Sequence, residues 1–134
     1  MDNPIQQLVH DFLKHLSERN ITALTQLFAE KVDWYIPGDQ EKAAWLGTRT
    51  NRQEIVDFFD LLWKNTEPVA ATIDNILSDE AHAVITGEFS TKMLPTNKIV
   101  HSLFCIHMQV RDHKIVRYRL LEDSFAVSQS LSAD

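Results

Sequence analysis

Three side chains near the end of the chain are of types that do acid–base chemistry: His107, Tyr118 and Glu122. Residues 112–113 predict a tight two-residue turn between two strands. Counting back from that turn places His107 opposite Tyr118, and directly opposite residues share a face of a sheet. A histidine can accept or donate a proton near neutral pH, and a tyrosine can donate a hydrogen bond to a developing oxyanion. We therefore expect His107 as the acid–base group, Tyr118 as the polarising group, and Glu122 as a carboxyl group whose pKa rises on burial.

This grouping depends on the register of the two strands. In the same register Gln109 faces Val116, Cys105 faces Leu120 and Leu103 faces Glu122. A slip of one residue would flip every assignment and would bring Arg117, Arg119 and Asp123 to that face instead. An ordinary hydrogen-bonded pair in the core would also explain His107 opposite Tyr118, so both interpretations stay open.

The elements that position these residues follow from the apolar periodicity of the chain. Helical spacing and capping residues (Asn3, Asn20 and Asn51) predict helices over 4–19, from 20 to about 28, and from 51 to shortly before Pro68. Strand patterns cover 32–36, 69–77, 81–89, 99–111 and 114–123. The Ser-rich segment 124–134 is expected to be frayed. Helices followed by an antiparallel meander predict an α+β fold with the helices on one face of a curved sheet.

Several short segments, in this order and spacing, resemble the SnoaL-like domains of the nuclear transport factor 2-like superfamily, which is related to ketosteroid isomerase. The segments are Leu27-Phe28-Ala29-Glu30 with Val32-Asp33-Trp34, Ile36-Pro37-Gly38, Trp45-Leu46-Gly47, Ile55-Val56 with Phe58-Phe59, Ile76-Leu77-Ser78-Asp79, Gly87-Glu88-Phe89, and 114–119 with Glu122-Asp123. The resemblance implies a cone-shaped, cystatin-like curved antiparallel sheet with three helices on one face. It covers nearly the whole chain, so we expect one domain over 1–134, with its core at about 4–123 and a polar tail at 124–134.

The resemblance also implies a ligand pocket between the concave face of the sheet and the helices. The face that carries His107, Tyr118 and Glu122 is then the concave one. Gly87 would leave room there for a ligand, and Trp45, in a polar loop, could be a lid over an apolar ligand. The expected ligand-binding residues are Phe12, Trp34, Ile36, Trp45, Phe59, Ile85, Gly87, Phe89, Leu103, Cys105 and Leu120.

Steroid isomerisation itself is not expected. The related isomerase uses a tyrosine on the first helix, a base near the end of the first strand and a protonated acid on a late strand. The matching positions here hold Phe12, Ile36, and either Ile106 or His107. Phenylalanine and isoleucine can neither donate a hydrogen bond nor take a proton.

Composition narrows the class of function further. The formal net charge of −6 over 134 residues argues against nucleic-acid or anionic-membrane partners. No apolar run approaches the roughly 20 residues of a membrane helix, and the first residues do not resemble a signal peptide, so a cytoplasmic protein is expected. Cys105 is the one cysteine and is expected to be a small buried hydrophobe. His101 and His107 are too far apart along a strand, about 20 Å at ~3.3 Å per residue, to share a metal, and we expect neither metal nor cofactor.

Two functions and one mode of assembly follow from these features. The first function is a cofactor-independent enzyme of isomerase, cyclase or dehydratase type that acts on a small hydrophobic or carbonyl compound. The alternative is a noncatalytic ligand-binding or dimerisation module. We also expect a homodimer, because the second face of the hairpin would expose apolar residues unless the C-terminal tail covers them. The residues expected on that convex face are Phe104, Ile106, Met108, Val110, Ile115, Arg117, Arg119 and Leu121.

Overall fold

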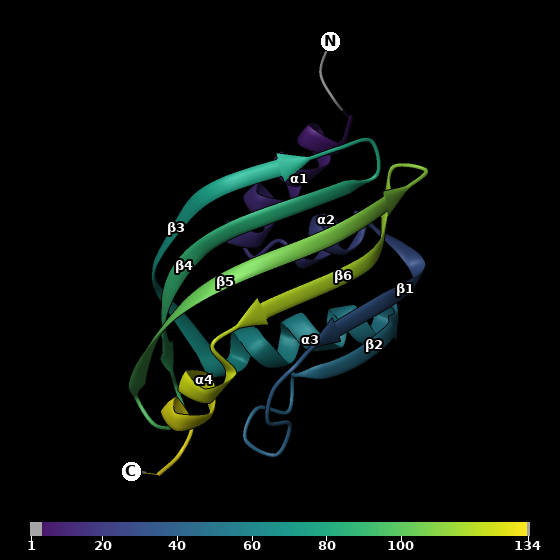
Figure 1. Ribbon diagram of the computed structural model, residues 1–134. Helices are drawn as coiled ribbons and strands as arrows, with labels where there is room; N and C mark the ends of the chain where they lie inside the picture. Colours follow the sequence, from purple (N-terminus) through teal and green to yellow (C-terminus); the bar gives the residue numbers. More distant parts are fainter. Residues whose placement is uncertain (1–3, 134) are drawn as a thin grey trace.

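The helices and the sheet form two layers in the computed structural model, which describes residues 4–133 (Figure 1). The elements are α1 (Pro4–Ser17), α2 (Ile21–Thr25), β1 (Phe28–Ile36), β2 (Gly47–Asn51), α3 (Arg52–Asn65), β3 (Thr66–Ser78), β4 (His82–Met93), β5 (Lys98–Arg111), β6 (Lys114–Glu122) and α4 (Ser124–Ser130). The predicted α+β class, with helices packed against a curved sheet, is confirmed.

The six strands lie in the order β2-β1-β6-β5-β4-β3. Neighbouring strands are antiparallel except β1 and β6, which run parallel. Figure 1 shows the sheet curving around α1, α2 and α3. We call the face that packs against these helices the inner face, and the opposite face the outer face.

A cluster of aromatic rings joins the two layers. Trp34 of β1 stacks on Tyr118 of β6, with ring centroids 4.1 Å apart and planes 16° apart. Phe12 of α1 lies 6.0 Å from Tyr118, and Phe58 of α3 meets Trp34 edge-on at 4.8 Å. Phe28 completes the cluster at 5.7 Å from Trp34. Aromatic rings bury large areas and prefer offset or edge-on contacts, so this cluster fixes α1 and α3 against the sheet.

Side-chain caps start two of the helices where the sequence predicts them. The side chain of Asn51 accepts a hydrogen bond from the Glu54 backbone N–H at 2.9 Å, and Glu54 accepts one from the Thr50 backbone N–H at 2.7 Å. Asn20 accepts one from the Ala23 N–H at 3.2 Å and caps α2. Both caps satisfy orphan donors of the first helical turn. The predicted cap at Asn3 lies outside the described residues.

The predicted register of the β5–β6 hairpin is wrong by one residue beyond its turn. The turn itself is as expected, because Asp112 and His113 both have positive φ and Arg111 pairs with Lys114. A bulge then breaks the ladder, since Val110 pairs with Ile115 but Gln109 pairs with Arg117. Val116 is therefore an extra residue on β6, as in other β-bulges. Beyond it, Tyr118 pairs with Met108, and His107 pairs with Arg119.

The C-terminal segment is not frayed as predicted. Residues Ser124–Ser130 form α4, and the Asp123 side chain caps it by accepting from the Ala126 N–H at 3.0 Å. Val127 is buried, and the Thr96 hydroxyl and Lys98 ammonium donate to backbone carbonyls of Ser130 and Ser132. These contacts hold the segment against the rest of the domain, although its polar composition predicted a frayed tail. Within residues 4–133, none of the helices has the length and apolar character that crossing a membrane requires.

Candidate functional site

Glu122 places a carboxyl group on the inner face at the end of β6. It pairs with Phe104 of β5, and the residue is only partly exposed. Among the described residues, no hydrogen bond or ion pair engages this carboxyl group. Burial away from water raises the pKa of Glu122 from its ordinary value to about 7. A carboxyl group with this pKa can exchange a proton near neutral pH, as a general acid or base must.

Tyr118 and Trp34 add two hydrogen-bond donors to the same inner face. Both side chains are buried, and burial raises the pKa of Tyr118 well above its ordinary value, with the nearby charge of Glu122 adding to the effect. The Tyr118 hydroxyl makes no hydrogen bond within residues 4–133. The indole N–H of Trp34 is also buried and has no hydrogen-bond partner in this part of the chain. Buried polar groups are nearly always paired, so the buried indole N–H, close to a hydroxyl and a partly exposed carboxyl group that also lack partners, calls for a cause.

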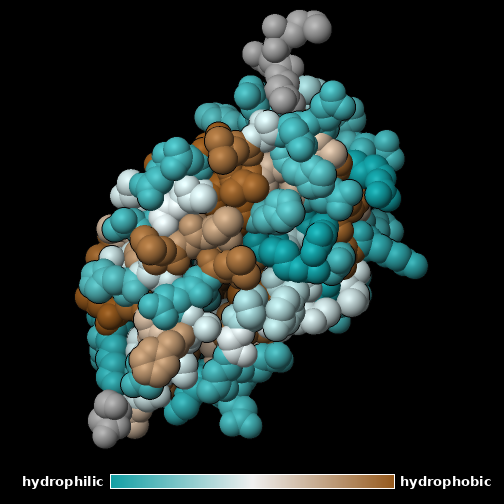
Figure 2. All heavy atoms as spheres, in the orientation of Figure 1, coloured by the Kyte–Doolittle hydropathy of each residue, from teal (hydrophilic) through white to brown (hydrophobic). Residues whose placement is uncertain are grey.

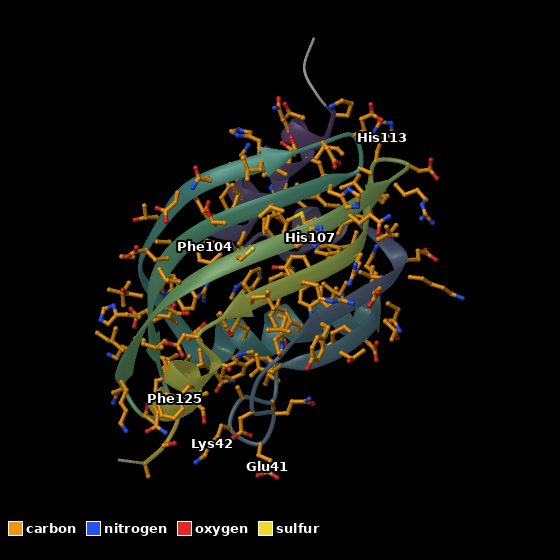
Figure 3. The ribbon with its side chains drawn as sticks, in the orientation of Figure 1. Glu41, Lys42, Phe104, His107, His113 and Phe125 are labelled. Atoms are coloured by element: carbon orange, nitrogen blue, oxygen red, sulfur yellow. The ribbon has the colours of Figure 1, made fainter. Side chains whose placement is uncertain are left out.

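His107 is not part of this group, and its predicted pairing with Tyr118 is wrong. Because of the bulge, His107 pairs with Arg119 on the outer face (Figure 3). Its ring lies 5.7 Å from the ring of His82, which in turn contacts Asp79 at 3.1 Å. Desolvation, and after it the positive charges of His82, Arg117 and Arg119, lower the pKa of His107. The register places Tyr118 and Glu122 on one face, as predicted. His107 is not on that face, and neither are Arg117 and Arg119, which a register slipped by one residue would have placed there.

Two predicted wall residues on β5 also face outward. Leu103 is 71% exposed and pairs with Glu88, and Cys105 pairs with Leu121. The same one-residue shift that moves His107 moves these two, because side chains alternate along a strand. The expected buried environment of Cys105 is wrong in the same way, since Cys105 is only partly buried on the outer face.

The remaining predicted wall residues lie on or under the inner face. Phe89 and Leu120 are partly buried near Glu122, on strands β4 and β6. The fully buried members are Phe12, Trp34, Ile36, Phe59 and Ile85. Trp45 is buried as well, and its carbonyl accepts a hydrogen bond from Arg49 at 3.4 Å. The structure therefore holds Trp45 in the core, and its predicted role as a lid stays a prediction.

Gly87 does not leave room for a ligand. A Cβ atom there would lie 2.1 Å from the Thr72 carbonyl oxygen and 3.0 Å from the Phe104 ring. Phe104 pairs with Gly87 across β4 and β5, so its ring occupies the space that the missing side chain leaves. The glycine serves close packing, which corrects the prediction of open space at this position.

Two of the hollows that indent the surface of the described residues contain none of the unpaired groups. One, of about 450 Å³, lies between α1 and the two hairpin turns at Glu80 and at 112–113. The other, of about 290 Å³, lies beside Asp123 and includes Ser90 and His101, whose side chains are 2.5 Å apart. We place the candidate site at Glu122 despite these hollows, because unpaired buried polar groups indicate a ligand more specifically than an open depression does.

Three residues that the sequence placed on the outer face lie on the inner face: Phe104, Ile106 and Met108. They pair with Glu122, Leu120 and Tyr118 respectively. A usable pattern was present, because these three residues are more apolar than Leu103, Cys105 and His107 between them. The predicted faces were instead assigned by counting residues from the turn at 112–113. The bulge at Val116 makes that count wrong by one residue. Of the two residues expected at the late-strand acid position, Ile106 lies on the inner face and His107 on the outer face.

Comparison with known proteins agrees with this geometry. Residues 9–118 match the model of the SnoaL-like domain. The fold is similar to that of a nuclear transport factor 2-like protein from Burkholderia xenovorans LB400, with a TM-score of 0.88, 17% identity and 98% of each chain covered. TerC, co-crystallized with polyporic acid, gives a TM-score of 0.83 at 16% identity, with 96% of this chain and 98% of that chain covered. An epoxide hydrolase from M. tuberculosis gives a TM-score of 0.71 at 14% identity, with 93% of this chain and 86% of that chain covered. No curated protein sequence matches the chain.

Proposed function

Because the chain belongs to the SnoaL-like domain family, we propose that its interior binds a small hydrophobic carbonyl compound and that Glu122 moves a proton on that compound without a cofactor. The observation that carries this proposal is the carboxyl group of Glu122, which lies on the inner face with no protein partner. A carboxyl group that is partly withdrawn from water and has no protein partner costs free energy when it is charged, so its presence is better explained by use than by stability.

The inner face offers the parts that proton abstraction next to a carbonyl needs. The carboxylate of Glu122 would take a proton from the carbon beside the carbonyl, which leaves an enolate and a neutral glutamic acid. The Tyr118 hydroxyl, held on the same face of the same strand, would donate a hydrogen bond to the enolate oxygen. Returning the proton to the same or another carbon gives exchange or isomerisation. His107, the acid–base group expected from the sequence, has no part in this scheme because it lies on the outer face.

Access to the site is supported by a gradient of burial along the inner face. Met108 and Tyr118 are buried, whereas Phe104, Leu120 and Glu122 are each partly exposed. The partly exposed end is where β6 finishes and α4 begins. A ligand would enter there and reach Glu122 first, with Tyr118 deeper inside. Similar folds of a protein crystallised with polyporic acid and of an epoxide hydrolase are compatible with small-molecule chemistry.

Hydrogen–deuterium exchange tests the proposal without knowledge of the natural substrate. The protein is incubated with 2-tetralone in D₂O, and deuterium at the carbon next to the carbonyl is followed by NMR. We expect protein-dependent exchange that Glu122→Gln lowers by about 10²-fold or more, the usual contribution of a general base. Glu88→Gln, on the outer face of β4, is the matched control and should exchange at the wild-type rate. Equal rates in the two variants would contradict the role of Glu122. Binding without any exchange would favour a noncatalytic ligand-binding module.

We also propose that the protein is a homodimer that pairs through the outer face. Leu77, Leu103 and Leu121 are 63%, 71% and 52% exposed there. Figure 2 shows hydrophobic residues gathered across this face, with hydrophilic residues around them. Monomers rarely expose such patches, and two-fold pairing would bury both copies at once. Helix α4 leaves these leucines exposed, so the C-terminal segment does not provide the cover considered from the sequence.

The patch differs from the one predicted from the sequence. Ile106, Met108 and Ile115 are buried rather than exposed, and Phe104 and Val110 pack against the core. Of the predicted set, only Arg117, Arg119 and Leu121 keep their predicted face. Light scattering at micromolar concentration should therefore give a dimer that becomes a monomer in the double variant Leu103→Asp, Leu121→Asp. Leu94→Asp, at an exposed leucine in the turn between β4 and β5, should remain a dimer. A monomeric wild type, or a double variant that stays dimeric, would contradict the proposal.

A further inference from the structure

Two buried side-chain nitrogens of residues 4–133 have no hydrogen-bond partner and no part in the proposed proton transfer: Nδ1 of His15 and the indole N–H of Trp34. Nδ1 of His15 lies 3.7 Å from the Glu18 carboxylate, whereas the indole N–H of Trp34 has no such charged partner within the described residues. Trp34 has no exposed surface, and its nitrogen has no hydrogen-bond partner among residues 4–133. An unmade hydrogen bond on a buried donor typically costs about 1–3 kcal/mol. A phenylalanine would fill much of the same space without this cost. A bound ligand that accepts a hydrogen bond from the N–H would explain why a tryptophan is present instead.

The surroundings of Trp34 leave few ways to satisfy this donor within the protein. One face of the indole stacks on Tyr118, and the edges of Phe58 and Phe59 approach at 4.8 and 6.0 Å between centroids. Phe28 lies on a further side at 5.7 Å. These neighbours are aromatic rings, which accept an N–H only weakly through their π faces. No carbonyl, hydroxyl or carboxylate of the described residues reaches the nitrogen.

The strands align Trp34 with the proposed proton-transfer groups. Trp34 pairs directly with Tyr118 in the parallel β1–β6 ladder, so the two side chains share the inner face. Glu122 lies four residues farther along β6 on the same face, and its charge acts on the Tyr118 hydroxyl. One small molecule that reaches Tyr118 from Glu122 would therefore come to the Trp34–Tyr118 stack.

We propose that Trp34 is a ligand-binding residue whose indole N–H donates a hydrogen bond to an acceptor oxygen of the bound compound. This inference rests on the proposed function and narrows its substrate class. The ligand carries a carbonyl, ether or comparable acceptor oxygen on an apolar cyclic skeleton. Hydrocarbons lack the acceptor, and an ammonium group has only donors to offer to a donor site. A site built to hydrogen-bond one group discriminates strongly against analogues that lack it.

The experiment compares 2-tetralone with tetralin, which has the same ring skeleton without the carbonyl oxygen. Indole N–H resonances of the ¹⁵N-labelled full-length protein are recorded with each compound. The chain has three tryptophans, so the Trp34 resonance is assigned by elimination with Trp45→Phe and Trp63→Phe. We expect 2-tetralone to move the Trp34 N–H resonance downfield, as a new hydrogen bond does. Tetralin should leave that proton without a downfield shift, and Trp45 and Trp63 serve as internal controls.

A binding measurement provides an independent readout. Trp34→Phe should weaken the binding of 2-tetralone about tenfold, which matches the roughly 1.4 kcal/mol of one hydrogen bond. The same substitution should change the affinity for tetralin much less. Because the NMR comparison uses the wild-type protein, it remains decisive if Trp34→Phe folds poorly. An upfield Trp34 resonance that neither compound shifts, while both bind, would show that the N–H rests on an aromatic face and would overturn the inference.

The two proposals fail in different ways. Exchange that depends on Glu122, with a Trp34 resonance that 2-tetralone does not move, would retain the proton transfer and overturn the role of Trp34. A downfield shift of Trp34 without exchange would support the binding role and reject catalysis. Absence of binding by either compound would contradict both.

Discussion

The two faces of the sheet treat their polar side chains in opposite ways. On the inner face, Glu122 and Tyr118 are withdrawn from water and have no hydrogen-bond partners among the described residues. On the outer face, Arg119 contacts Asp33 at 2.9 Å and His82 contacts Asp79 at 3.1 Å. These two outer-face pairs are thus compensated, whereas the carboxyl group of Glu122 is not. The difference teaches that burial without a partner, rather than residue type alone, locates the candidate site.

One inserted residue decides which side chains belong to which face. Without the bulge at Val116, His107 would share the inner face with Tyr118. With it, a potential general base lies outside and a methionine, Met108, takes the place opposite Tyr118. The hydrophobic alternation of β5 and the actual register agree, because burying Phe104, Ile106 and Met108 stabilises the fold more than burying His107 would.

The largest expected effect is a difference in stability between alanine substitutions on the two faces of β5. Met108→Ala removes a fully buried side chain and should lower the free energy of unfolding by about 2–5 kcal/mol. Leu103→Ala truncates a side chain that is 71% exposed and should change the stability of the protomer by about 0.5 kcal/mol or less. Urea unfolding, under conditions where the variants are monomeric, gives both values. Similar losses in the two variants would contradict the assignment of faces.

An intermediate effect concerns the pH dependence of stability. The folded pKa of Glu122, about 7, is raised above its ordinary value of 4.5, so the folded state holds its proton more tightly than the unfolded state. This contribution to stability is fully present below about pH 4.5 and is lost as pH rises through about 7. Glu122→Gln removes the penalty and should stabilise the protein at pH 8 by on the order of 3 kcal/mol, with little gain at pH 4.

The measurement for this second prediction is urea unfolding of wild type and variant at the two pH values. Glu88→Gln on the outer face provides the control and should show no such pH-dependent gain. A Glu122→Gln variant that gains equally at both pH values would indicate a packing effect instead of relief of a buried charge.

The smallest expected effect is that of His107 on the chemistry. His107→Ala should leave deuterium exchange into 2-tetralone within about twofold of wild type, because the imidazole lies on the other face of the sheet and general-base losses are usually ~10²-fold or more. The exchange assay described above measures it directly. A tenfold or greater loss, with an unchanged unfolding curve, would restore the acid–base role that the sequence suggested for His107.

Much of the fold follows from local signals in the sequence. Asn20 and Asn51 cap helices as their residue types predict, and the turn at 112–113 forms where expected. The site follows only in part, because Tyr118 and Glu122 are recognisable by type but their neighbours depend on the ladder. No residue in the segment 114–117 marks Val116 as a bulge. The role of Gly87 was equally hidden, since it depends on the Phe104 ring from another strand.

A single titration tests the contrast between the faces most directly. In one sample with ¹³C-labelled glutamate and histidine, NMR follows the Glu122 carboxyl carbon and the His107 ring as pH changes, first alone and then with 2-tetralone. The account predicts a midpoint near 7 for Glu122 and one below 6.5 for His107, with the ligand shifting the Glu122 midpoint only. A Glu122 midpoint near 4.5, or a ligand that moves His107 and leaves Glu122 unchanged, would contradict it.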